Sequence, residues 1–347
     1  MTDKPVGVGI IGVGGIALEH MKALRASSQL RLIGVTDMDI GRASEVAHLE
    51  RCESYPDVAD MLAAEEVEAV IVCTPNFSHA ELGRQVLEAD KHLLMEKPLA
   101  MHAADAAQLA EMAAQRGLAL AVGHSHRFSD QGIAISEVIE SGAIGTPRFV
   151  RIVMNGGWIW PGWQAWVLNP EASGGHSLHN GVHLSDLASW WIGEPAESVF
   201  SVGQKATSAA LGIYDYLVME LSFPSGATAV CEVSRGERPR GASFLEMTVV
   251  GSEGVLSREW DANGLLMWNE AGIEAPAPDG TGLRVFVREL ESFAAAVRGQ
   301  GQVTPPVSAA VHAVQVAEAS ERSLALGQTV RITDISKKDA SATGEQA

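Results

Sequence analysis

The chain of 347 residues is poor in cysteine and in positive charge. Its three cysteines, Cys52, Cys73 and Cys231, are odd in number and far apart, and none lies in a CxxC pair, which predicts reduced thiols and no disulfide framework. The chain has 25 lysines and arginines but 43 acidic residues, so its formal net charge is −18. The basic residues form no cluster along the sequence. Nucleic acid and anionic membranes both require basic surface, so neither is an expected partner.

Long apolar runs are also missing. No segment approaches the ~20 apolar residues that span a bilayer, and the opening residues lack the charged-then-apolar pattern of a signal peptide. We find no internal repeat. These absences predict a soluble, cytoplasmic protein. The composition, 46% hydrophobic and 20% charged, allows large cores, and the length allows about two domains of ~100–200 residues.

The first stretch with a specific chemical meaning is VGVGIIGVGG at 6–15, a β-branched run that stops at glycines before a helical pattern. Gly12-x-Gly14-x-x-Ala17 is the dinucleotide fingerprint of strand, tight turn and helix. Gly12 permits the turn, Gly14 lets the backbone approach a pyrophosphate, and Ala17 lets the helix lie close to the strand. The helix N-terminus offers free N–H groups to phosphates. A glycine-rich turn that binds nothing is the alternative.

A second apolar strand, LRLIGVTD at 30–37, ends in an acid twenty residues after Ala17. Asp37 in this position accepts hydrogen bonds from ribose hydroxyls and repels a 2′-phosphate, which favours NAD over NADP. Arg42 lies five residues further on and weakens that discrimination. The alternative for Asp37 is a solvated acid at a strand end.

Strands and helices continue to alternate as far as residue 124. This rhythm predicts a parallel sheet with helices on both faces. Further strands are expected at 67–75, 91–98 and 118–124. Helices are expected at 77–90, with Ser78 as N-cap, and at 103–117, closed by Gly117.

Ligands of such sheets lie beyond the carboxyl ends of the strands. Glu96, Lys97, His124 and Arg127 all fall at those ends. Pro98 favours an extended conformation at Lys97, whose ammonium can then reach a substrate hydroxyl. For an isolated lysine, a surface position at a strand end is the alternative.

From about residue 125 the pattern changes to strands without intervening helices, several of them alternating apolar and polar residues. This predicts a largely antiparallel sheet with one face covered and one available for binding. Residues 249–257 are typical of a hairpin built on Gly251 and Gly254. Helices are expected at 284–298 and 307–326, and the polar residues 334–347 are expected to be a disordered tail.

The segment SGGHSLHNGVHLSD at 173–186 holds three histidines. If 180–192 is helical, His179 and His183 share one face. Their spacing also suits a zinc pair, with His176 as a third ligand. Nicotinamide chemistry needs a base and no metal, and an imidazole titrating near ~6.5 can serve. We therefore expect proton transfer and no metal, with Asp186 either orienting His183 or capping the helix.

Four of the eight tryptophans lie within nine residues, at Trp158, Trp160, Trp163 and Trp166. Indoles can stack on the apolar faces of sugar rings or pack against a partner subunit. Simple core packing around a loop explains part of the cluster.

Taken in order, these segments resemble the Gfo/Idh/MocA family of oxidoreductases, named for glucose-fructose oxidoreductase and inositol dehydrogenase. The matching segments run from residue 6 to about 330: GVGGIA, the acid that ends the second strand, TPNFSHA, EKP, GH-x-HRF, WVLNP-x-x-SGG, GVH-x-x-D and GSEGVL. The resemblance implies an α/β protein. An N-terminal Rossmann domain with a doubly wound parallel sheet (1–123) precedes a C-terminal α+β domain with an open, mostly antiparallel sheet (124–333).

The resemblance also implies the reaction, which is NAD-dependent hydride transfer at a ring carbon of a sugar, inositol or related polyol, by a homo-oligomer assembled through the C-terminal sheet. Lys97 matches the EKP lysine near the reacting hydroxyl, and His183 matches the acid/base histidine of GVH. The family usually has an aspartate four residues before that histidine, where this chain has His179. We expect His179 to assist His183 or to bind a neighbouring hydroxyl.

The expected sites therefore divide into three groups. The catalytic residues are Lys97, His183 and His179. The cofactor residues are Gly12, Gly14, Gly15, Ile16, Asp37, Arg42, Thr74, Pro75, Asn76, His79, Glu96 and Lys97. The substrate residues are Lys97, His124, Arg127, Trp158, Trp163, Trp166, His176, His179, Asn180 and His183.

Two other functions stay open. One is a related enzyme that keeps its NAD tightly bound and uses it transiently in elimination, hydrolysis or epimerisation of a sugar derivative. The other is a non-catalytic nucleotide sensor, which would need neither Lys97 nor His183. The redox hypothesis depends on the lysine and the two imidazoles acting at one nicotinamide ring.

Overall fold

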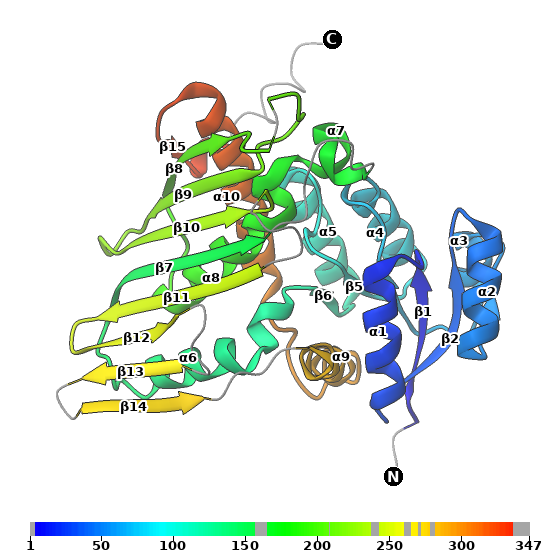
Figure 1. Ribbon diagram of the computed structural model, residues 1–347. Helices are drawn as coiled ribbons and strands as arrows, with labels where there is room; N and C mark the ends of the chain where they lie inside the picture. Colours follow the sequence, from blue (N-terminus) through cyan, green and yellow to red (C-terminus); the bar gives the residue numbers. More distant parts are fainter. Residues whose placement is uncertain are drawn as a thin grey trace. The chain divides into compact units, whose positions relative to one another are not determined.

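The computed structural model describes residues 4–156, 165–207, 209–236, 243–259, 265–269, 272–277 and 282–335 (Figure 1). The chain divides into two compact units. Unit 1 consists of Met1–Met101, Asp105–Phe128 and Thr281–Val311, and unit 2 of His102–Ala104, Ser129–Gly280 and His312–Ala347. Unit 1 therefore contains a segment that lies far along the chain from the rest of it.

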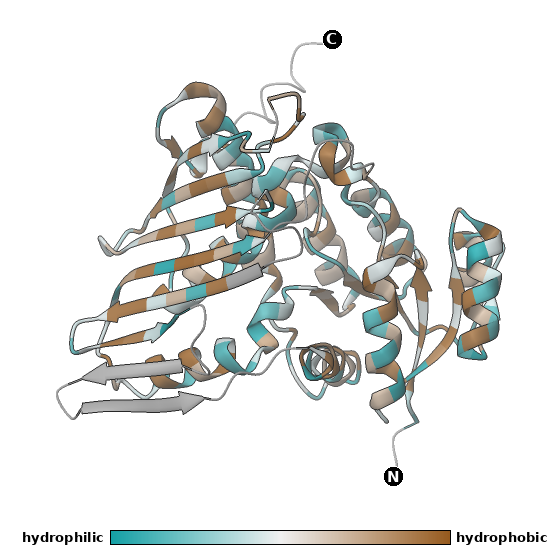
Figure 2. Ribbon diagram, in the orientation of Figure 1, coloured by the Kyte–Doolittle hydropathy of each residue, from teal (hydrophilic) through white to brown (hydrophobic). Residues whose placement is uncertain are grey.

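Unit 1 is built on a six-stranded parallel sheet in the order β3-β2-β1-β4-β5-β6. The strands are β1 (Val6–Ile11), β2 (Leu30–Thr36), β3 (Glu53–Ser54), β4 (Ala69–Val72), β5 (His92–Met95) and β6 (Leu120–Val122). Every residue of β1 and β4 is buried, as expected for strands covered on both faces, and their β-branched residues suit that position. Figure 2 shows the hydropathy of each residue along the ribbon. The order reverses between β1 and β4, the place where doubly wound sheets bind ligands.

The described α-helices of unit 1 are α1 (Gly15–Ala26), α2 (Ile40–Glu50), α3 (Val58–Ala63), α4 (His79–Glu88), α5 (Ala103–Arg116) and α9 (Leu283–Val297). α9 packs beside α1 (Figure 1). Its Leu290, Phe293 and Ala294 enter the same core as Ile10 and Leu94. Burial of each large apolar side chain contributes about 1.5–3 kcal/mol, so this late helix is an integral part of the unit 1 core.

Unit 2 contains a nine-stranded mixed sheet in the order β14-β13-β12-β11-β7-β10-β9-β8-β15. The strands are β7 (Pro147–Gly156), β8 (Ser198–Gln204), β9 (Tyr216–Ser222), β10 (Thr228–Ser234), β11 (Ser243–Gly251), β12 (Gly254–Arg258), β13 (Leu265–Asn269), β14 (Gly272–Ala277) and β15 (Val330–Arg331). All pairs are antiparallel except β7 with β10. Alternate residues of β8, β9 and β10 are buried, which is the pattern of a sheet covered on one face.

The helices of unit 2 are α6 (Asp130–Glu140), α7 (Pro170–Ser173), α8 (Val182–Ile192) and α10 (Val307–Leu326), with a 3-10 turn η3 (Trp166–Leu168) and a π-helical turn η4 (Ser177–Gly181). α8 packs on β7 and β10. α10 reaches β8, where the Ser323 hydroxyl accepts a hydrogen bond from the Ser201 N–H at 2.9 Å. Both helices therefore lie on the covered face of the sheet.

The predicted fold class is confirmed, and three local expectations need correction. α6 was not expected, although the Ser129 hydroxyl caps it by accepting from the Gly132 N–H at 3.0 Å. The helix expected from residue 180 begins at Val182, because residues 177–181 form the wider π-turn. Ser78 does not cap α4 with its side chain. Its hydroxyl donates backward to Thr74 Oγ1 at 2.7 Å and to the Pro75 carbonyl at 2.8 Å.

No helix in the described ranges has the length and apolar character to cross a bilayer.

Candidate active site

The glycine turn after β1 has the form that the fingerprint predicts. Gly12 has a φ of 87°, and a Cβ there would lie 2.8 Å from the Cys73 carbonyl oxygen, so no other residue fits. Gly14 precedes the first turn of α1 and gives it no side-chain cap. A Cβ on Gly14 or Gly15 would meet no atom within 4 Å. The start of α1 therefore offers uncapped N–H groups to open space, as a bound pyrophosphate requires.

Asp37 follows β2 directly and ties the glycine turn to α2. Its Oδ2 accepts from the Val13 N–H at 2.8 Å, and its Oδ1 accepts from the Asp39 N–H at 2.9 Å and from the Arg42 guanidinium at 2.7 Å. Burial pushes the pKa of Asp37 upward, but these donors outweigh it and hold the pKa below the ordinary value. Asp37 is thus an anion at neutral pH, with a neighbouring cation at Arg42.

Several large apolar side chains are exposed at the same edge of the sheet. Ile16, Met38, Ile40 and Phe77 come from the segments after β1, β2 and β4, and Met38 is fully exposed. The sequence analysis singled out Ile16 but not the other three. Exposed apolar side chains beside an acid at the end of β2 suit the faces of an adenine base.

The segments after β4 and β5 are joined through a buried histidine. His79 lies between the Thr74 carbonyl, at 2.9 Å from Nε2, and the Pro98 carbonyl, at 2.7 Å from Nδ1. Burial lowers the pKa of His79 in spite of these two carbonyl contacts. With no exposed surface, His79 supports the Thr74–Pro75 segment from behind. Asn76 is buried beside it at the start of η1 (Asn76–Ser78).

Glu96 and Lys97 occupy the end of β5, with the carboxylate inside and the lysine half-buried. Glu96 Oε1 lies 2.7 Å from His20 Nε2 on α1, and its Oε2 accepts from the Lys97 N–H at 3.1 Å. Burial raises the pKa of Glu96, but His20 and the Lys97 charge and N–H lower it below its usual range. A buried anion therefore stands next to Lys97. The sequence analysis assigned no site role to His20.

His124 and Arg127 follow β6, where both are buried. The Arg127 N–H donates to the His124 carbonyl at 3.0 Å as the 3-10 turn η2 (Ser125–Phe128) begins. α9 fixes this turn, because Arg288 donates to the Phe128 carbonyl at 3.0 Å. In unit 1 the structure thus gathers the expected cofactor residues, Lys97, His124 and Arg127 at the carboxyl ends of five neighbouring strands.

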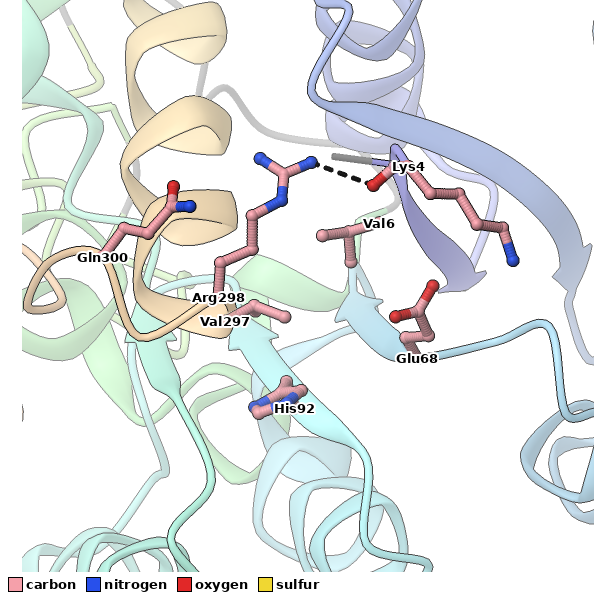
Figure 3. A pocket seen from close by; sticks show the side chains of 7 residues that line it. All are labelled: Lys4, Val6, Glu68, His92, Val297, Arg298 and Gln300. Atoms are coloured by element: carbon pink, nitrogen blue, oxygen red, sulfur yellow. Dashed lines mark hydrogen bonds between the residues drawn. The ribbon is translucent and has the colours of Figure 1, made fainter. Parts of the chain in front are cut away.

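A cavity of about 380 Å³ lies at the opposite, amino-terminal edge of this sheet (Figure 3). It is lined by Lys4, Val6, Glu68, His92, Val297, Arg298 and Gln300. Arg298 serves the fold there, because it donates to the Lys4 carbonyl at 3.2 Å and to the Gln29 carbonyl at 2.9 Å. None of the expected site residues reaches this cavity.

In unit 2 the histidine segment is held between two left-handed glycines and α8. Gly174 (φ 75°) ends α7, Gly175 (φ 85°) follows it, and η4 then leads into α8. His179 lies in η4 and His183 in the first turn of α8, where it is 8% exposed. A π-turn is a frequent feature of functional sites, because it shifts side chains out of regular helical register.

The neighbours of these histidines differ. His176 Nδ1 donates to the Tyr214 carbonyl at 3.0 Å, which gives His176 a structural anchor. The His179 ring meets Trp166 edge to face, with ring centroids 5.1 Å apart. Trp158 and Trp163, two other expected substrate residues, lie outside the described residues, as does Trp160.

Asn180 is oriented by a buried arginine that the sequence analysis missed. Arg235 donates to Asn180 Oδ1 at 3.0 Å. Burial lowers the pKa of Arg235 to about 10. Among the described residues, no group of three or more His, Cys, Asp or Glu side chains is arranged to hold a metal ion.

A glycine turn tied to an acid at the switch point of a doubly wound sheet defines a dinucleotide-binding domain. The description "Oxidoreductase family, NAD-binding Rossmann fold" matches residues 6–124, and "GFO/IDH/MocA C-terminal domain" matches residues 133–257. The chain belongs to the Gfo/Idh/MocA family of NAD-binding oxidoreductases. The resemblance inferred from the sequence, and NAD as the cofactor, are confirmed.

Individual relatives support this assignment. The myo-inositol 2-dehydrogenase of Thermotoga maritima is 30% identical over 232 residues, which are 66% of this chain and 68% of that protein. The inositol 2-dehydrogenase of Rhizobium meliloti is 26% identical over 341 residues, 93% of this chain and 98% of that protein. The crystal structure of GenD2 from gentamicin A biosynthesis, in complex with NAD, has a TM-score of 0.84 at 26% identity and covers 95% of this chain and 97% of its own.

Proposed function

We propose that this enzyme transfers a hydride between NAD and a ring hydroxyl or ketone of a sugar, inositol or related polyol. The observation that carries the proposal is the arrangement at the edge of unit 1, where an open glycine turn and the anion of Asp37 accompany a lysine backed by a buried carboxylate. The substrate class is supported by the relatives that are named inositol 2-dehydrogenases.

The residues of unit 1 fit NAD. The uncapped N–H groups at the start of α1 would receive the pyrophosphate, and Gly14 and Gly15 leave room for it. Asp37 would accept from the adenosine ribose hydroxyls, and Met38, Ile40 and Phe77 would cover the adenine. When bound, NAD takes up the hydride in alcohol oxidation and returns it in ketone reduction. Because Asp37 is an anion, a 2′-phosphate is disfavoured and NAD is preferred over NADP.

Three side chains carry the proton chemistry in this proposal. The Lys97 ammonium donates a hydrogen bond to the reacting oxygen, next to the buried anion of Glu96. His183 takes the hydroxyl proton during oxidation and returns it during reduction. His179 stands where the family usually has an aspartate, and it binds a neighbouring hydroxyl or assists His183. His124 and Arg127 complete the polar surface beside Lys97.

Recognition of a carbohydrate ring would involve both its apolar face and its hydroxyls. Trp166 is 37% exposed and lies against His179, so it can stack on the apolar face of a ring. Asn180, held by Arg235, presents its amide to hydroxyl groups. We further propose that the enzyme works in the cytoplasm. We also propose that it is a homo-oligomer assembled through the nine-stranded sheet. Light scattering of the purified protein would test the oligomeric state.

The test is NAD-linked turnover with a panel of inositols and sugars, comparing wild type with His183→Ala. A positioned general base is worth roughly 10²–10⁴ in rate, so His183→Ala should lower kcat at least about a hundredfold with NAD binding unchanged. His48→Ala is the matched control, because His48 is exposed on α2, and it should leave kcat unaltered.

Near-normal turnover of His183→Ala would reject the role given to His183. Absence of NAD binding, or of turnover with every member of the panel, would count against the reaction itself. Nucleotide that stays bound through turnover, with no net NADH formed, would indicate transient use of the cofactor instead.

A further inference from the structure

α9 brings a carboxyl group into the core of unit 1. Glu289 lies on the buried face of the helix, four residues from both Val285 and Phe293, where an apolar side chain would be expected. It is 2% exposed, and neither carboxyl oxygen has a hydrogen-bond partner among the described residues. An ionised carboxylate without donors is strongly disfavoured in such a place, so this group needs an explanation.

The surroundings of Glu289 connect it to Lys97. Phe286, one turn earlier on α9, contacts the His20 ring edge to face with centroids 5.2 Å apart. His20 Nε2 in turn lies 2.7 Å from Glu96 Oε1, and Glu96 Oε2 receives the Lys97 N–H. The buried Cys73 thiol lies in the same core as Leu290 and Phe293; burial raises its pKa, and the charges of Glu96 and, at alkaline pH, Glu289 raise it further. The two carboxyl groups therefore belong to one buried neighbourhood.

Hydrogen-bond donors decide which carboxyl group carries a proton. The Glu96 carboxylate accepts hydrogen bonds from His20 Nε2 and from the Lys97 N–H, so its anionic form is stabilised. Glu289 accepts no hydrogen bond from the described residues. Burial, followed by the charge of Glu96, raises the pKa of Glu289 well above its usual range. Two nearby carboxyl groups in a dry core cannot both ionise easily, and the proton resides on the one without donors.

A buried acceptor on His20 is a suitable partner for that proton. His20 Nδ1 is buried without a partner among the described residues. When Nε2 donates to the Glu96 anion, Nδ1 carries a lone pair, while a neutral Glu289 offers an O–H donor. A single buried water can join such a donor to such an acceptor.

Other titratable groups lie on the elements around α9. The turn η2 and the residue just before it carry His126, Arg127 and His124, of which Arg127 and His124 are buried. α9 itself carries Arg284, Glu291 and Arg288, which donates to the Phe128 carbonyl. α1 carries Glu19, Lys22 and Arg25, whose side chains are partly exposed. The negative charge that acts on Glu289 comes from Glu96.

We propose that His20, Glu96 and Glu289 form one proton-sharing cluster inside unit 1, in which Glu289 is a positioning residue that holds a proton and so keeps a single negative charge behind Lys97. Ionisation of Glu289 would place a second anion in the cluster and draw the ammonium of Lys97 inward, away from a substrate oxygen. This consequence for turnover rests on the role proposed for Lys97, whereas the proton on Glu289 does not.

The first experiment detects that proton directly by infrared spectroscopy of the whole protein at neutral pH. A protonated carboxylic acid gives a carbonyl band separate from the bands of carboxylates. We expect this band in the wild type, a loss of its intensity in Glu289→Gln, and its full intensity in Glu291→Gln. Glu291 lies on the same helix, but its side chain is exposed and accepts from the Ser27 hydroxyl at 3.0 Å, so both variants remove one carboxyl group from α9.

The second experiment compares pH profiles of kcat and KM. Glu289→Gln imitates the neutral acid, so its kcat at neutral pH should stay within about threefold of wild type. At alkaline pH the wild type and Glu291→Gln should lose kcat as Glu289 ionises, and Glu289→Gln should not.

Absence of the carbonyl band from the wild type at neutral pH, or undiminished intensity of the band in Glu289→Gln, would overturn the cluster. If Glu289→Gln fails to fold, the wild type alone provides the test. Loss of its carbonyl band on alkaline titration would support a buried protonated acid, and a band that does not change with pH would contradict it. Identical pH profiles for the two variants would overturn the effect on Lys97. A band that behaves as expected in a protein without NAD-linked turnover would refute the proposed function while leaving the cluster in place.

Discussion

Replacement of Gly175 by alanine should disturb the histidine segment in a way that separates two physical effects. Gly175 has a φ of 85°, and a Cβ built on it overlaps the carboxylate of Glu321 on α10. That carboxylate is not free to move away without loss, because its Oε1 accepts from the Ser177 N–H at 3.2 Å at the start of η4. Gly175→Ala therefore combines backbone strain with displacement of a hydrogen-bonded acid.

The size of each effect follows from the local structure. The left-handed backbone disfavours alanine by roughly 1–2 kcal/mol. Loss of the Glu321 acceptor leaves a buried N–H unsatisfied, which costs about 1–3 kcal/mol. Gly193, at the other end of α8, supplies the control, because it also has a positive φ (89°) but a Cβ there would meet no atom within 4 Å. Gly193→Ala should therefore show the strain alone.

Thermal unfolding of the two variants measures the difference. An additional loss of ~1–3 kcal/mol corresponds to a Tm lower by roughly 2–12 °C for Gly175→Ala than for Gly193→Ala. Gly175→Ala should also lower kcat more, since η4 carries His179. In a Glu321→Ala background the excess should vanish, because the overlapping group is gone. Equal losses for the two glycine variants, or an excess that survives without Glu321, would refute the reasoning.

Two further outcomes follow from the ionisable groups of unit 1. Arg42→Ala should raise the preference for NAD over NADP by about tenfold in kcat/KM, ~1.4 kcal/mol, because it removes the cation that pairs with Asp37 at 2.7 Å and leaves the anion to face a 2′-phosphate; an unchanged ratio would contradict this. Glu289→Gln should unfold at a higher Tm than wild type, with a gap that widens as pH rises. The raised pKa of Glu289 means that the folded state binds the extra proton, so wild-type stability falls by up to ~1.4 kcal/mol per pH unit from the unfolded pKa, ~4.3, to the folded pKa. A gap that does not depend on pH would show that Glu289 has no raised pKa.

The sequence predicts the parts of this protein whose physics is local. The glycine turn at Gly12 and the acid at Asp37 are fixed by the backbone geometry of a strand, a tight turn and a helix, and both lie where the pattern places them. The bounds 307–326 of α10 match the expected range, because its apolar periodicity continues without a break. The register of a helix and the backbone conformation of a turn depend on a few residues that are adjacent in the sequence. They can therefore be predicted from the sequence alone.

Contacts between distant segments are a different matter. The pattern of α9 shows that one face is buried, and it even places Glu289 on that face, but it cannot show that the face packs beside α1. His20 and Glu96 are 76 residues apart and meet only because α1 lies next to the end of β5. The π-turn at 177–181 also escapes prediction, since the wide turn depends on supports from α10 and the sheet.

In both units, a buried acid from a helix late in the chain accompanies a segment of the proposed site. Glu289 on α9 is buried in the unit 1 core, where the charge of Glu96 acts on it, and Glu321 on α10 accepts from the Ser177 N–H at the start of η4. Burial raises the pKa of both acids, so each is more easily kept neutral than a surface glutamate. Helices are stiffer than the glycine-rich turns that they support, so a carboxyl group fixed on a helix can position a loop that its own sequence leaves adaptable. The two supports should respond differently to alkaline pH, because ionised Glu289 adds a second anion near Glu96 without a donor, whereas ionised Glu321 keeps the Ser177 N–H as a donor.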